Sequence, residues 1–293
     1  MKKAAIAIGS NSTRLLIADA TDGGLANIVR GREETRLFSA LDENGLLAQE
    51  RILATAQAVA RLHAQALAAG ARDVSVLATS ATRDAKNSDA LAQAVQALTG
   101  CRLQIISGEE EARLAFRAAA GTARRLVIDV GGGSTEMTLG ENGEIAFAAS
   151  AQMGSTRLLR LCPIACPADA ARAREIAANA LAPDAAQLAS LPPAPRMIGL
   201  GGACTTAAAI QSGREMHGDA VEGMTVTRAE AERQLAALSA MTLEERMRVP
   251  GLPPTRAAHM PHGLCILLSV MALCGHDTLT VSGKTNLDGY LTA

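Results

Sequence analysis

Short apolar runs that stop at glycine or at polar residues alternate along this chain with longer, alanine-rich segments. The short runs are typical of buried strands, and apolar residues at helical spacing indicate helices. Strands are predicted at residues 6–8, 15–19, 25–29, 74–79, 103–106, 126–130, 135–139, 143–149, 197–200 and 278–282. Helices are predicted at residues 51–69, 88–100, 167–188, 227–238 and 265–274, with a short terminal segment at 286–291.

Turn residues refine this pattern. Asp22-Gly23-Gly24 is expected to join two antiparallel strands, and Pro183 is expected to interrupt the 167–188 helix, because proline removes a backbone donor. Alternating strands and helices, with a strand meander opening each half, predict an α/β protein with two sheets.

The stretch at residues 126–139 combines an apolar strand, three glycines and a second apolar strand. Glycines at such a bend allow backbone N–H groups to converge on a phosphate oxygen. Asp129 and Glu136 flank the turn, and two carboxylates beside a phosphate repel it unless a divalent cation lies between them. The stretch therefore predicts a phosphate site with Mg²⁺, although such a glycine-rich turn can also be a simple tight hairpin.

The chain contains this pattern twice. Residues 6–15 align without a gap on residues 128–137, which lie 122 positions further along. Two strand-turn-strand phosphate loops, one at the start of each half, imply two related domains that face each other across a cleft. We place the domains at residues 1–121 and 122–293, with the last helix packing back on the first. One difference stands out: Ala7 stands where the second copy has Asp129.

Two further segments carry candidate chemistry. Residues 197–206 predict a strand, a glycine-rich turn and a helix start, where free N–H groups can receive an anion. After the strand at 103–106, Ser107 and Glu110 have the spacing of a capping box. Capping accounts for Glu110, and acids are ordinary in a first helical turn, so this explanation covers much of the acidic triplet but leaves one acid to spare.

Composition restricts the function. A net charge of −1 with 1% aromatic residues argues against a general nucleic-acid binder, which needs a basic field and stacking platforms. The most apolar later run, residues 265–274, is too short to cross a bilayer and predicts a buried helix. Six scattered cysteines favour reduced thiols in a cytoplasmic protein, with a structural metal at Cys162 and Cys166 as the lesser alternative.

The three glycine-rich turns resemble, in order and spacing, the two phosphate motifs and the adenosine-type motif of the actin-like, sugar kinase and chaperone ATPase superfamily. More narrowly, residues 78–83, 107–113 and 250–256 resemble the exopolyphosphatase and guanosine pentaphosphate phosphohydrolase family in its short form. The resemblance covers nearly the whole chain. It implies two actin-like, ribonuclease H-like domains and hydrolysis of a terminal phosphoanhydride bond, and it suggests a homodimer.

The resemblance also implies roles for individual residues. Glu111 matches the proposed catalytic glutamate that activates water, Arg83 matches the arginine that faces the phosphate, and Asp129 and Glu136 match the carboxylates that help to hold Mg²⁺. The phosphate-binding residues that it implies are Gly9, Ser10, Asn11, Ser12, Thr13, Arg14, Gly131, Gly132, Gly133, Ser134, Thr135, Gly201 and Gly202.

Three positions depart from the family pattern. Ala7 replaces an expected aspartate, Gly283 replaces the acid that usually follows Ser282, and Ala203 replaces a usual threonine. A methyl group cannot ligate Mg²⁺ or position its water shell. These changes are compatible with weak hydrolysis, with an altered substrate, or with loss of turnover.

Three functions therefore stay open at this stage. The first is a Mg²⁺-dependent phosphohydrolase acting on inorganic polyphosphate or guanosine pentaphosphate, and the second is a regulatory homologue that binds polyphosphate or a guanosine penta- or tetraphosphate without turnover. The third is a sugar kinase or ATPase, which the scarcity of aromatic residues disfavours. The sequence does not choose between polyphosphate and the guanosine nucleotide. Arg32, Arg36, Lys86, Arg113 and Arg117 could extend a basic track for a long polyanion, or be solvated surface charges.

Overall fold

The computed structural model describes residues 2–21, 24–119 and 121–292. The chain divides into two compact units, the first made of Met1–Ala118 with Asn286–Ala293 and the second of Ala119–Thr285. This division falls close to the boundary predicted after residue 121, and it groups the terminal helix with the first unit. Asp22 and Gly23 of the predicted turn lie outside the described residues.

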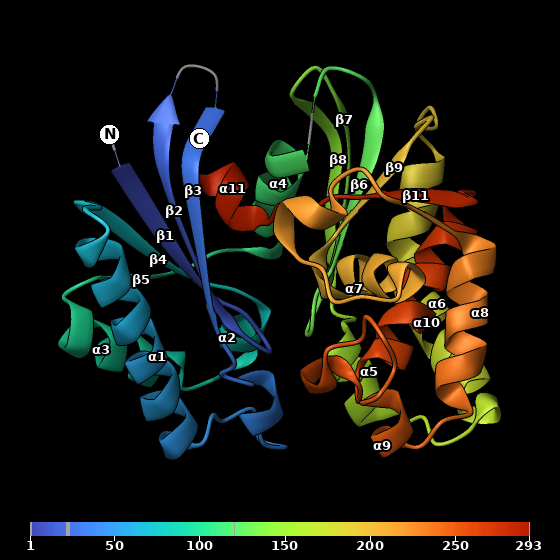
Figure 1. Ribbon diagram of the computed structural model, residues 1–293, viewed down its shortest axis with the longest axis horizontal. Helices are drawn as coiled ribbons and strands as arrows, with labels where there is room; N and C mark the ends of the chain where they lie inside the picture. Colours follow the sequence, from blue (N-terminus) through green and yellow to red (C-terminus); the bar gives the residue numbers. More distant parts are fainter. Residues whose placement is uncertain (1, 22–23, 120, 293) are drawn as a thin grey trace. The chain divides into compact units, whose positions relative to one another are not determined.

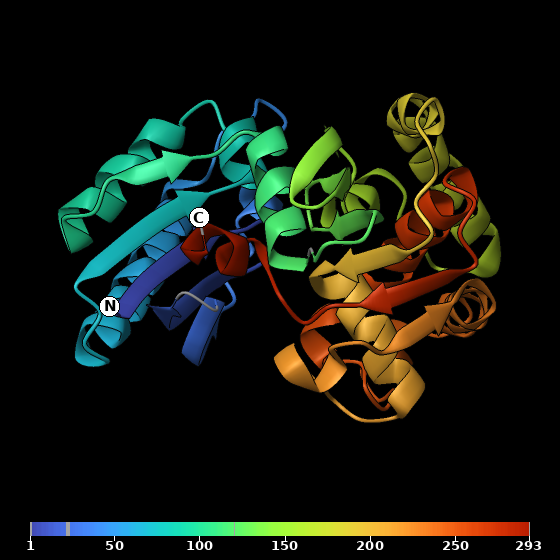
Figure 2. The same ribbon diagram turned by 90° about the horizontal axis from the view of Figure 1, so that it is seen from above.

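The first unit contains a five-stranded sheet in the order β3-β2-β1-β4-β5. The first three strands form an antiparallel meander, β4 runs parallel to β1, and β5 runs parallel to β4. Figure 2 shows β4 beside β1. The strand bounds are β1 Lys2–Ile8, β2 Thr13–Thr21, β3 Gly24–Glu33, β4 Asp73–Ala78 and β5 Leu103–Ile105.

Alternate residues of β1 face opposite sides of this sheet. Ile6 and Ile8 join a core with the helices α1 (Gln49–Ala68) and α3 (Ser88–Thr99). Ala5 and Ala7 face the other side, in an apolar cluster with Leu287 and Leu291 of α11 (Asn286–Leu291). Figure 1 shows α11 in red beside the blue strands of this sheet. The unit also contains α2 (Ser80–Asp84), α4 (Gly108–Ala119) and a 3₁₀ turn at Phe38–Ala40.

The second unit contains a six-stranded sheet in the order β10-β11-β9-β6-β7-β8. As in the first unit, an antiparallel meander, here β6-β7-β8, is followed by a parallel neighbour, β9. The strand bounds are β6 Arg125–Val130, β7 Thr135–Glu141, β8 Glu144–Ala151, β9 Met197–Leu200, β10 Thr225–Thr227 and β11 Thr278–Val281. The mixed sheets and their helices confirm the α/β fold class.

Helices cover the second sheet around α10 (Met260–Leu273), the predicted apolar helix, which is buried along most of its length. The other helices are α5 (Ser155–Leu161), α6 (Pro167–Ala189), α7 (Gly201–Ser212), α8 (Arg228–Ser239) and α9 (Leu243–Arg246), with 3₁₀ turns at Gly218–Val221 and Pro254–Arg256. No helix within the described ranges has the length and hydropathy needed to cross a membrane.

The predicted interruption at Pro183 is wrong, because α6 continues through this residue. Proline costs the helix one hydrogen bond and crowds the preceding turn. Leu181 and Ala185, on either side of the proline, are buried in the core of the second unit. Their packing, together with the alanine-rich sequence, stabilises the helix against this local cost.

An ion pair within the first unit connects β3 to α11. Both terminal nitrogens of Arg30 donate to the carboxylate of Asp288, at 3.0 and 2.7 Å. The Asp288 side chain is only 5% exposed, whereas Arg30 is 29% exposed. We expect Asp288→Ala to lower the free energy of unfolding by about 1–3 kcal/mol, because it removes a charged, mostly buried hydrogen-bond acceptor. Urea denaturation measures the change.

A matched control lies on the same strand. Glu33 pairs with Arg61, whose side chain is 60% exposed. Glu33→Ala should therefore cost only about 0–1 kcal/mol. An equal cost for the two variants would contradict the structural role of the Arg30–Asp288 pair.

Candidate active site

The first predicted phosphate loop is a tight turn between β1 and β2. The N–H of Gly9 donates to the carbonyl of Ser12 at 3.0 Å. Two donors from the segment after β3 hold the outer side of the turn: the Arg36 N–H binds the Asn11 carbonyl at 2.9 Å, and the Phe38 N–H binds the Ser10 carbonyl at 2.9 Å. The loop is therefore fixed by its own hydrogen bonds.

The second loop has the same construction between β6 and β7. The N–H of Gly131 donates to the carbonyl of Ser134 at 3.0 Å. In both turns, a Cβ on the first glycine would lie 3.0 Å from the serine oxygen, which is closer than ordinary packing. The gapless repeat in the sequence is thus also a repeat in backbone geometry.

Strand register places the candidate charges opposite each other. Asp129 is directly opposite Glu136 in the β6–β7 pair, and Ala7 is directly opposite Arg14 in the β1–β2 pair. Directly opposed residues point to the same face of a sheet with their Cβ atoms about 5 Å apart. The second unit therefore presents two carboxylates where the first presents a methyl group and a guanidinium.

Both carboxylates are buried. Asp129 is 6% and Glu136 is 2% exposed, and the hydroxyl of Ser150 donates to Glu136 Oε1 at 2.8 Å. Two neighbouring buried carboxylates repel each other when both are ionised, and a divalent cation between them relieves this repulsion. No group of three or more His, Cys, Asp or Glu side chains in the described part of the chain is arranged to bind a metal. Mg²⁺ does not need one, because it commonly uses one or two carboxylates together with water and phosphate oxygens.

The carboxyl ends of β1, β4 and β5 meet at one edge of the first sheet. The Thr79 N–H donates to the Ile8 carbonyl at 3.1 Å, and the Ile106 N–H donates to the Ala78 carbonyl at 3.0 Å. The turn of residues 9–12, the start of α2 and the start of α4 all follow this edge. In parallel α/β sheets, ligands bind at such an edge.

Arg83 of α2 and Glu111 of α4 form an ion pair there. Arg83 Nη1 donates to Glu111 Oε2 at 2.9 Å and to the Ile106 carbonyl at 3.1 Å. Glu111 is 7% exposed, whereas the neighbouring Glu109 and Glu110 are exposed. The Glu110 N–H donates to the Ser107 hydroxyl at 3.1 Å, as the capping pattern predicts. Glu111 is thus the acid of the triplet that is held inside the protein.

Several buried polar atoms of the first unit have no hydrogen-bond partner among the described residues. Four of them, from β2 and α2, are Arg14 Nε, Ser80 Oγ, Thr82 Oγ1 and Arg83 Nη2, and the others are Thr55 Oγ1 and the side-chain amide atoms of Asn286. Orphaned buried donors are costly, and three of these four residues lie together in the short helix α2, which makes them candidates for binding a ligand. Two of the four are cationic guanidinium atoms, which fits an anionic ligand such as a phosphate.

The third glycine turn lies against the second phosphate loop. Gly201 has a φ of +82°, and a Cβ there would overlap Asp129 Oδ1 and lie 2.7 Å from the Val130 carbonyl oxygen. A Cβ on Gly202 would overlap the guanidinium of Arg256. The helix start of α7, Asp129 and Arg256 therefore converge within the second unit.

Arg256 is a candidate that sequence reasoning left without a role. Its motif at residues 250–256 supported the family resemblance, but nothing in the local pattern predicted that its side chain would lie on Gly202. The available signal was a pair of glycines at a helix start, since such glycines often make room for another group.

Cys204, which lies on α7, is not a nucleophile. Burial raises the pKa of its thiol far above the ordinary value, and the negative charge of Asp129 raises it further. The group is therefore a neutral thiol, and thiols attack only as thiolates.

Gly283, where the family usually has an acid, has a structural reason for being glycine. A Cβ there would overlap the Gly218 carbonyl oxygen. A carboxylate is nevertheless present: Glu222 Oε2 accepts hydrogen bonds from the Ser282 hydroxyl at 2.9 Å and from the Gly283 N–H at 2.8 Å. Glu222 thus places a carboxylate beside Gly283.

Two of the residues proposed for a basic track are already engaged in ion pairs. Arg32 and Arg36 both lie near Glu34, at 3.3 and 3.5 Å between charged atoms. Their side chains are 37% and 59% exposed, so these pairs are surface interactions.

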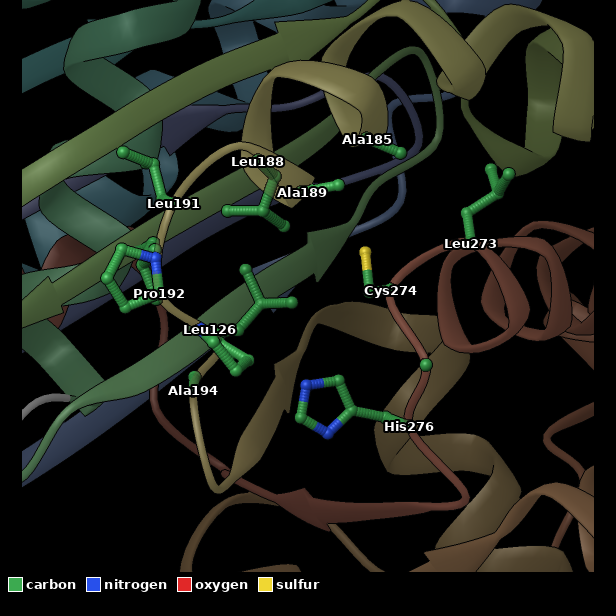
Figure 3. Close-up of a pocket in the computed structure, with 13 residues that line it drawn as sticks. Leu126, Ala185, Leu188, Ala189, Leu191, Pro192, Ala194, Leu273, Cys274 and His276 are labelled. Atoms are coloured by element: carbon green, nitrogen blue, oxygen red, sulfur yellow. The ribbon is translucent and has the colours of Figure 1, made fainter.

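A cavity of about 360 Å³ in the second unit is separate from these residues. Figure 3 shows apolar side chains around it, among them Leu126, Leu188 and Leu191, together with Cys274 and His276. It lies at the start of β6, whereas Asp129 lies near the end of that strand. Burial lowers the pKa of His276 below its ordinary value.

The contact between Gly201 and Asp129 gives a testable consequence. Gly201→Ala should lower the free energy of unfolding by about 1–2 kcal/mol for the left-handed backbone and by about 1–3 kcal/mol more for the overlap with Asp129 and Val130. Gly213, at the other end of α7, has a φ of +67°, and a methyl group there would have nothing within 4 Å. Gly213→Ala should cost only the backbone part, and equal costs by urea denaturation would contradict the close approach at Gly201.

Comparison with known proteins assigns the chain to a family. Residues 16–292 match the Ppx/GppA phosphatase family. Exopolyphosphatase 2 of Mycobacterium tuberculosis is 33% identical over 308 residues, which cover 98% of this chain and 96% of that protein. Guanosine-5'-triphosphate,3'-diphosphate pyrophosphatase of Vibrio vulnificus is 30% identical over 299 residues, covering 98% of this chain but only 58% of its own length.

Solved structures agree with the assignment. The Aquifex aeolicus PPX-GPPA enzyme superposes with a TM-score of 0.83 at 28% identity, covering 100% of this chain and 99% of that one. An exopolyphosphatase from Cytophaga hutchinsonii, at 22% identity, shares the fold with a TM-score of 0.89, covering 99% of this chain and 96% of that one. The two mixed sheets are therefore those of the actin-like fold, and the chain belongs to the Ppx/GppA phosphatase family.

Proposed function

We propose that this protein is a Mg²⁺-dependent phosphohydrolase that releases the terminal phosphate of inorganic polyphosphate or of guanosine pentaphosphate. The observation that carries the proposal is the ion pair between the partly exposed Arg83 and the buried Glu111 at the carboxyl edge of the first sheet. The names of the mycobacterial and Vibrio relatives support the two substrate classes. Both substrates present the same chemical group, a terminal phosphoanhydride.

Glu111 is proposed to act as the base. The adjacent Arg83 guanidinium favours the ionised carboxylate, which can orient a water molecule and accept its proton. The water oxygen attacks the terminal phosphorus, the bridging P–O bond breaks, and the shortened chain leaves with the bridging oxygen. Phosphoryl transfer of this kind depends on positioned charge and needs no covalent enzyme nucleophile.

The first unit is proposed to bind the phosphate that is transferred. Arg14 Nε, Arg83 Nη2 and the hydroxyls of Ser80 and Thr82 are buried without protein partners among the described residues, so they can donate to phosphate oxygens without breaking existing bonds. Ser10 and Ser12, in the loop whose backbone is held by its own turn, are proposed as further contacts.

The second unit is proposed to hold the cation. Asp129 and Glu136 fit Mg²⁺ because they are buried oxygen ligands on the same sheet face. When bound, Mg²⁺ supplies neutralisation of the phosphate charge. The α7 start at Gly201 and Gly202, together with Arg256, is proposed to add positive potential for the anionic substrate.

A regulatory homologue without turnover is the second candidate. Ala7 favours it, since this position is fully buried, lies opposite Arg14 and carries no carboxylate. Such a protein would bind the same polyanion through the same guanidinium groups, so the two candidates differ only in catalysis.

Phosphate release from long-chain polyphosphate and, separately, from guanosine pentaphosphate tests the enzyme proposal. Wild-type protein should release phosphate with Mg²⁺ and should lose this activity when the metal is chelated. Glu111→Gln should lower the rate at least about 100-fold, because it removes the proton acceptor while keeping the side-chain size.

The same helical turn provides the controls. Glu109→Gln and Glu110→Gln remove the same charge from exposed positions and should change the rate by no more than about twofold. Absence of phosphate release by wild-type protein from both substrates, with binding retained, would reject the enzyme proposal in favour of the regulatory one.

Restoring the missing acid gives a second test. Ala7→Asp places a carboxylate opposite Arg14 at the end of β1, and it should raise turnover or lower the Mg²⁺ concentration for half-maximal activity, by about tenfold. Ala5→Asp is the matched control, because Ala5 has the same strand, face and full burial but lies two residues further from the loop.

The control should lose stability without changing the Mg²⁺ dependence. Activity titrations against Mg²⁺, with urea denaturation of each variant, separate the two effects. An unchanged Mg²⁺ dependence in a folded Ala7→Asp protein would show that position 7 does not serve the metal.

A further inference from the structure

A pair of thiols lies in the short connection between α5 and α6, away from the residues given a catalytic role. Cys162 ends α5 and Cys166 begins α6, in the sequence Cys-Pro-Ile-Ala-Cys. Both are free cysteines. Cys162 is 5% exposed, whereas Cys166 is exposed to solvent. One thiol is therefore accessible to a small reagent and the other is sheltered beside it in the chain.

One residue of α6 contacts both sulfurs. Cys166 Sγ lies 3.3 Å from Asp169 Oδ2, and Cys162 Sγ lies 3.8 Å from the Asp169 backbone oxygen. Arg172 pairs with the same aspartate at 2.6 Å. The pKa of Arg172 is raised, first through a hydrogen bond with Cys162. Asp169 and Arg172 thus form a charged pair beside the two thiols.

Two buried side chains bind backbone carbonyls of this connection. His262 Nε2 lies 3.0 Å from the Cys162 carbonyl, and Arg246 Nη2 donates to the Ile164 carbonyl at 3.0 Å. His262 is fully buried and Arg246 is 5% exposed. Burial lowers the pKa of His262 to about 4, so the ring is neutral and its Nε2–H donates to the carbonyl. The connection that carries the thiols is therefore linked to α9 and α10 by two hydrogen bonds to its backbone.

Helix α5 links this connection to the second phosphate loop. At its start, the Ser155 and Thr156 N–H groups donate to the carbonyls of Gly131 and Gly132, at 2.9 and 2.8 Å. Arg157 Nε donates to the Gly133 carbonyl at 2.7 Å. The helix has seven residues, so Cys162 follows it within two turns of these contacts. A change at Cys162 therefore acts on a rigid element that supports all three glycines.

We propose that Cys162 and Cys166 form a reversible disulfide that regulates the second phosphate loop. The Cys166 thiolate attacks a low-molecular-weight disulfide, forms a mixed disulfide and releases one thiolate. The Cys162 thiolate then attacks the Cys166 sulfur, closes the intramolecular bridge and releases the second thiolate. Two protein thiols are oxidised, and one small disulfide is reduced to two thiols.

Closing the bridge breaks the contacts that the two sulfurs make with Asp169. It also draws the end of α5 towards the start of α6. The displaced α5 loosens the carbonyls of residues 131–133, and phosphate binding by that loop weakens. The expected loss of turnover rests on the proposed function, whereas bridge formation and loosening of the loop do not.

Oxidised and reduced glutathione, mixed at set ratios with the full chain, test the bridge. Trypsin cleaves after Arg160 and Arg172, so both cysteines fall in one peptide of residues 161–172. After alkylation of remaining thiols, this peptide should be unalkylated and lighter by two hydrogens in oxidised samples, and doubly alkylated after reduction. Full alkylation at every ratio would overturn the proposal.

Single variants define the chemistry. Cys162→Ser should accumulate glutathione on Cys166, because the resolving thiol is missing, whereas Cys166→Ser should take up little at Cys162. Cys274→Ser, in which the removed thiol lies elsewhere in the second unit, should form the bridge like wild type. Equal glutathione uptake by the first two variants would contradict the assigned order of attack.

Amide hydrogen exchange and phosphate release test the coupling. Oxidation should speed exchange in residues 131–134 and 155–158 and lower phosphate release about fivefold, with recovery on adding dithiothreitol. Cys162→Ser and Cys166→Ser should show neither redox response. A bridge without faster exchange would overturn the regulatory role. A protein that releases no phosphate in either state, yet shows the bridge and the faster exchange, would refute the hydrolase proposal and leave the switch supported.

Discussion

One hydrogen bond, made twice, determines the geometry of both candidate phosphate loops. In each, the first glycine N–H donates to a serine carbonyl three residues later, at 3.0 Å. A Cβ on Gly9 or Gly131 would lie 3.0 Å from the accepting serine oxygen, which is tighter than ordinary packing. Because the closed turn joins two neighbouring strands, it also sets their register, as hairpin turns generally do. Register then decides which side chains stand opposite each other.

At equivalent positions of this register, the two copies carry opposite charges. The first unit places Arg14 opposite the small Ala7, and the second places Glu136 opposite Asp129. A guanidinium favours a phosphate oxygen and a carboxylate pair favours a cation. The same backbone turn therefore carries opposite charges in the two units, because different residues occupy two equivalent positions. This difference is the basis for proposing that Asp129 and Glu136 hold the cation and that Arg14 contacts the phosphate.

Glycines in the second unit let groups distant in the sequence approach the loop. Gly201 makes room for Asp129, Gly202 for Arg256, and Gly154 for the backbone of residues 132 and 133. Each close approach needs the absence of a Cβ, so each substitution there carries a packing cost in addition to any chemical one. The support of the loop by α5 belongs to the same arrangement, and it is what makes the Cys162–Cys166 connection able to influence the loop.

The sequence alone determined the local features: the two repeated turns, the α/β alternation, the buried helix α10 and the capping of α4 by Ser107. These follow from periodicity, glycine placement and spacing within a few residues. Only the tertiary structure decided that Arg83 pairs with Glu111, that Arg256 lies on Gly202, that Glu222 stands beside Gly283 and that α6 continues through Pro183. Such contacts depend on packing between residues far apart in the chain, and local periodicity carries no information about which distant side chains meet.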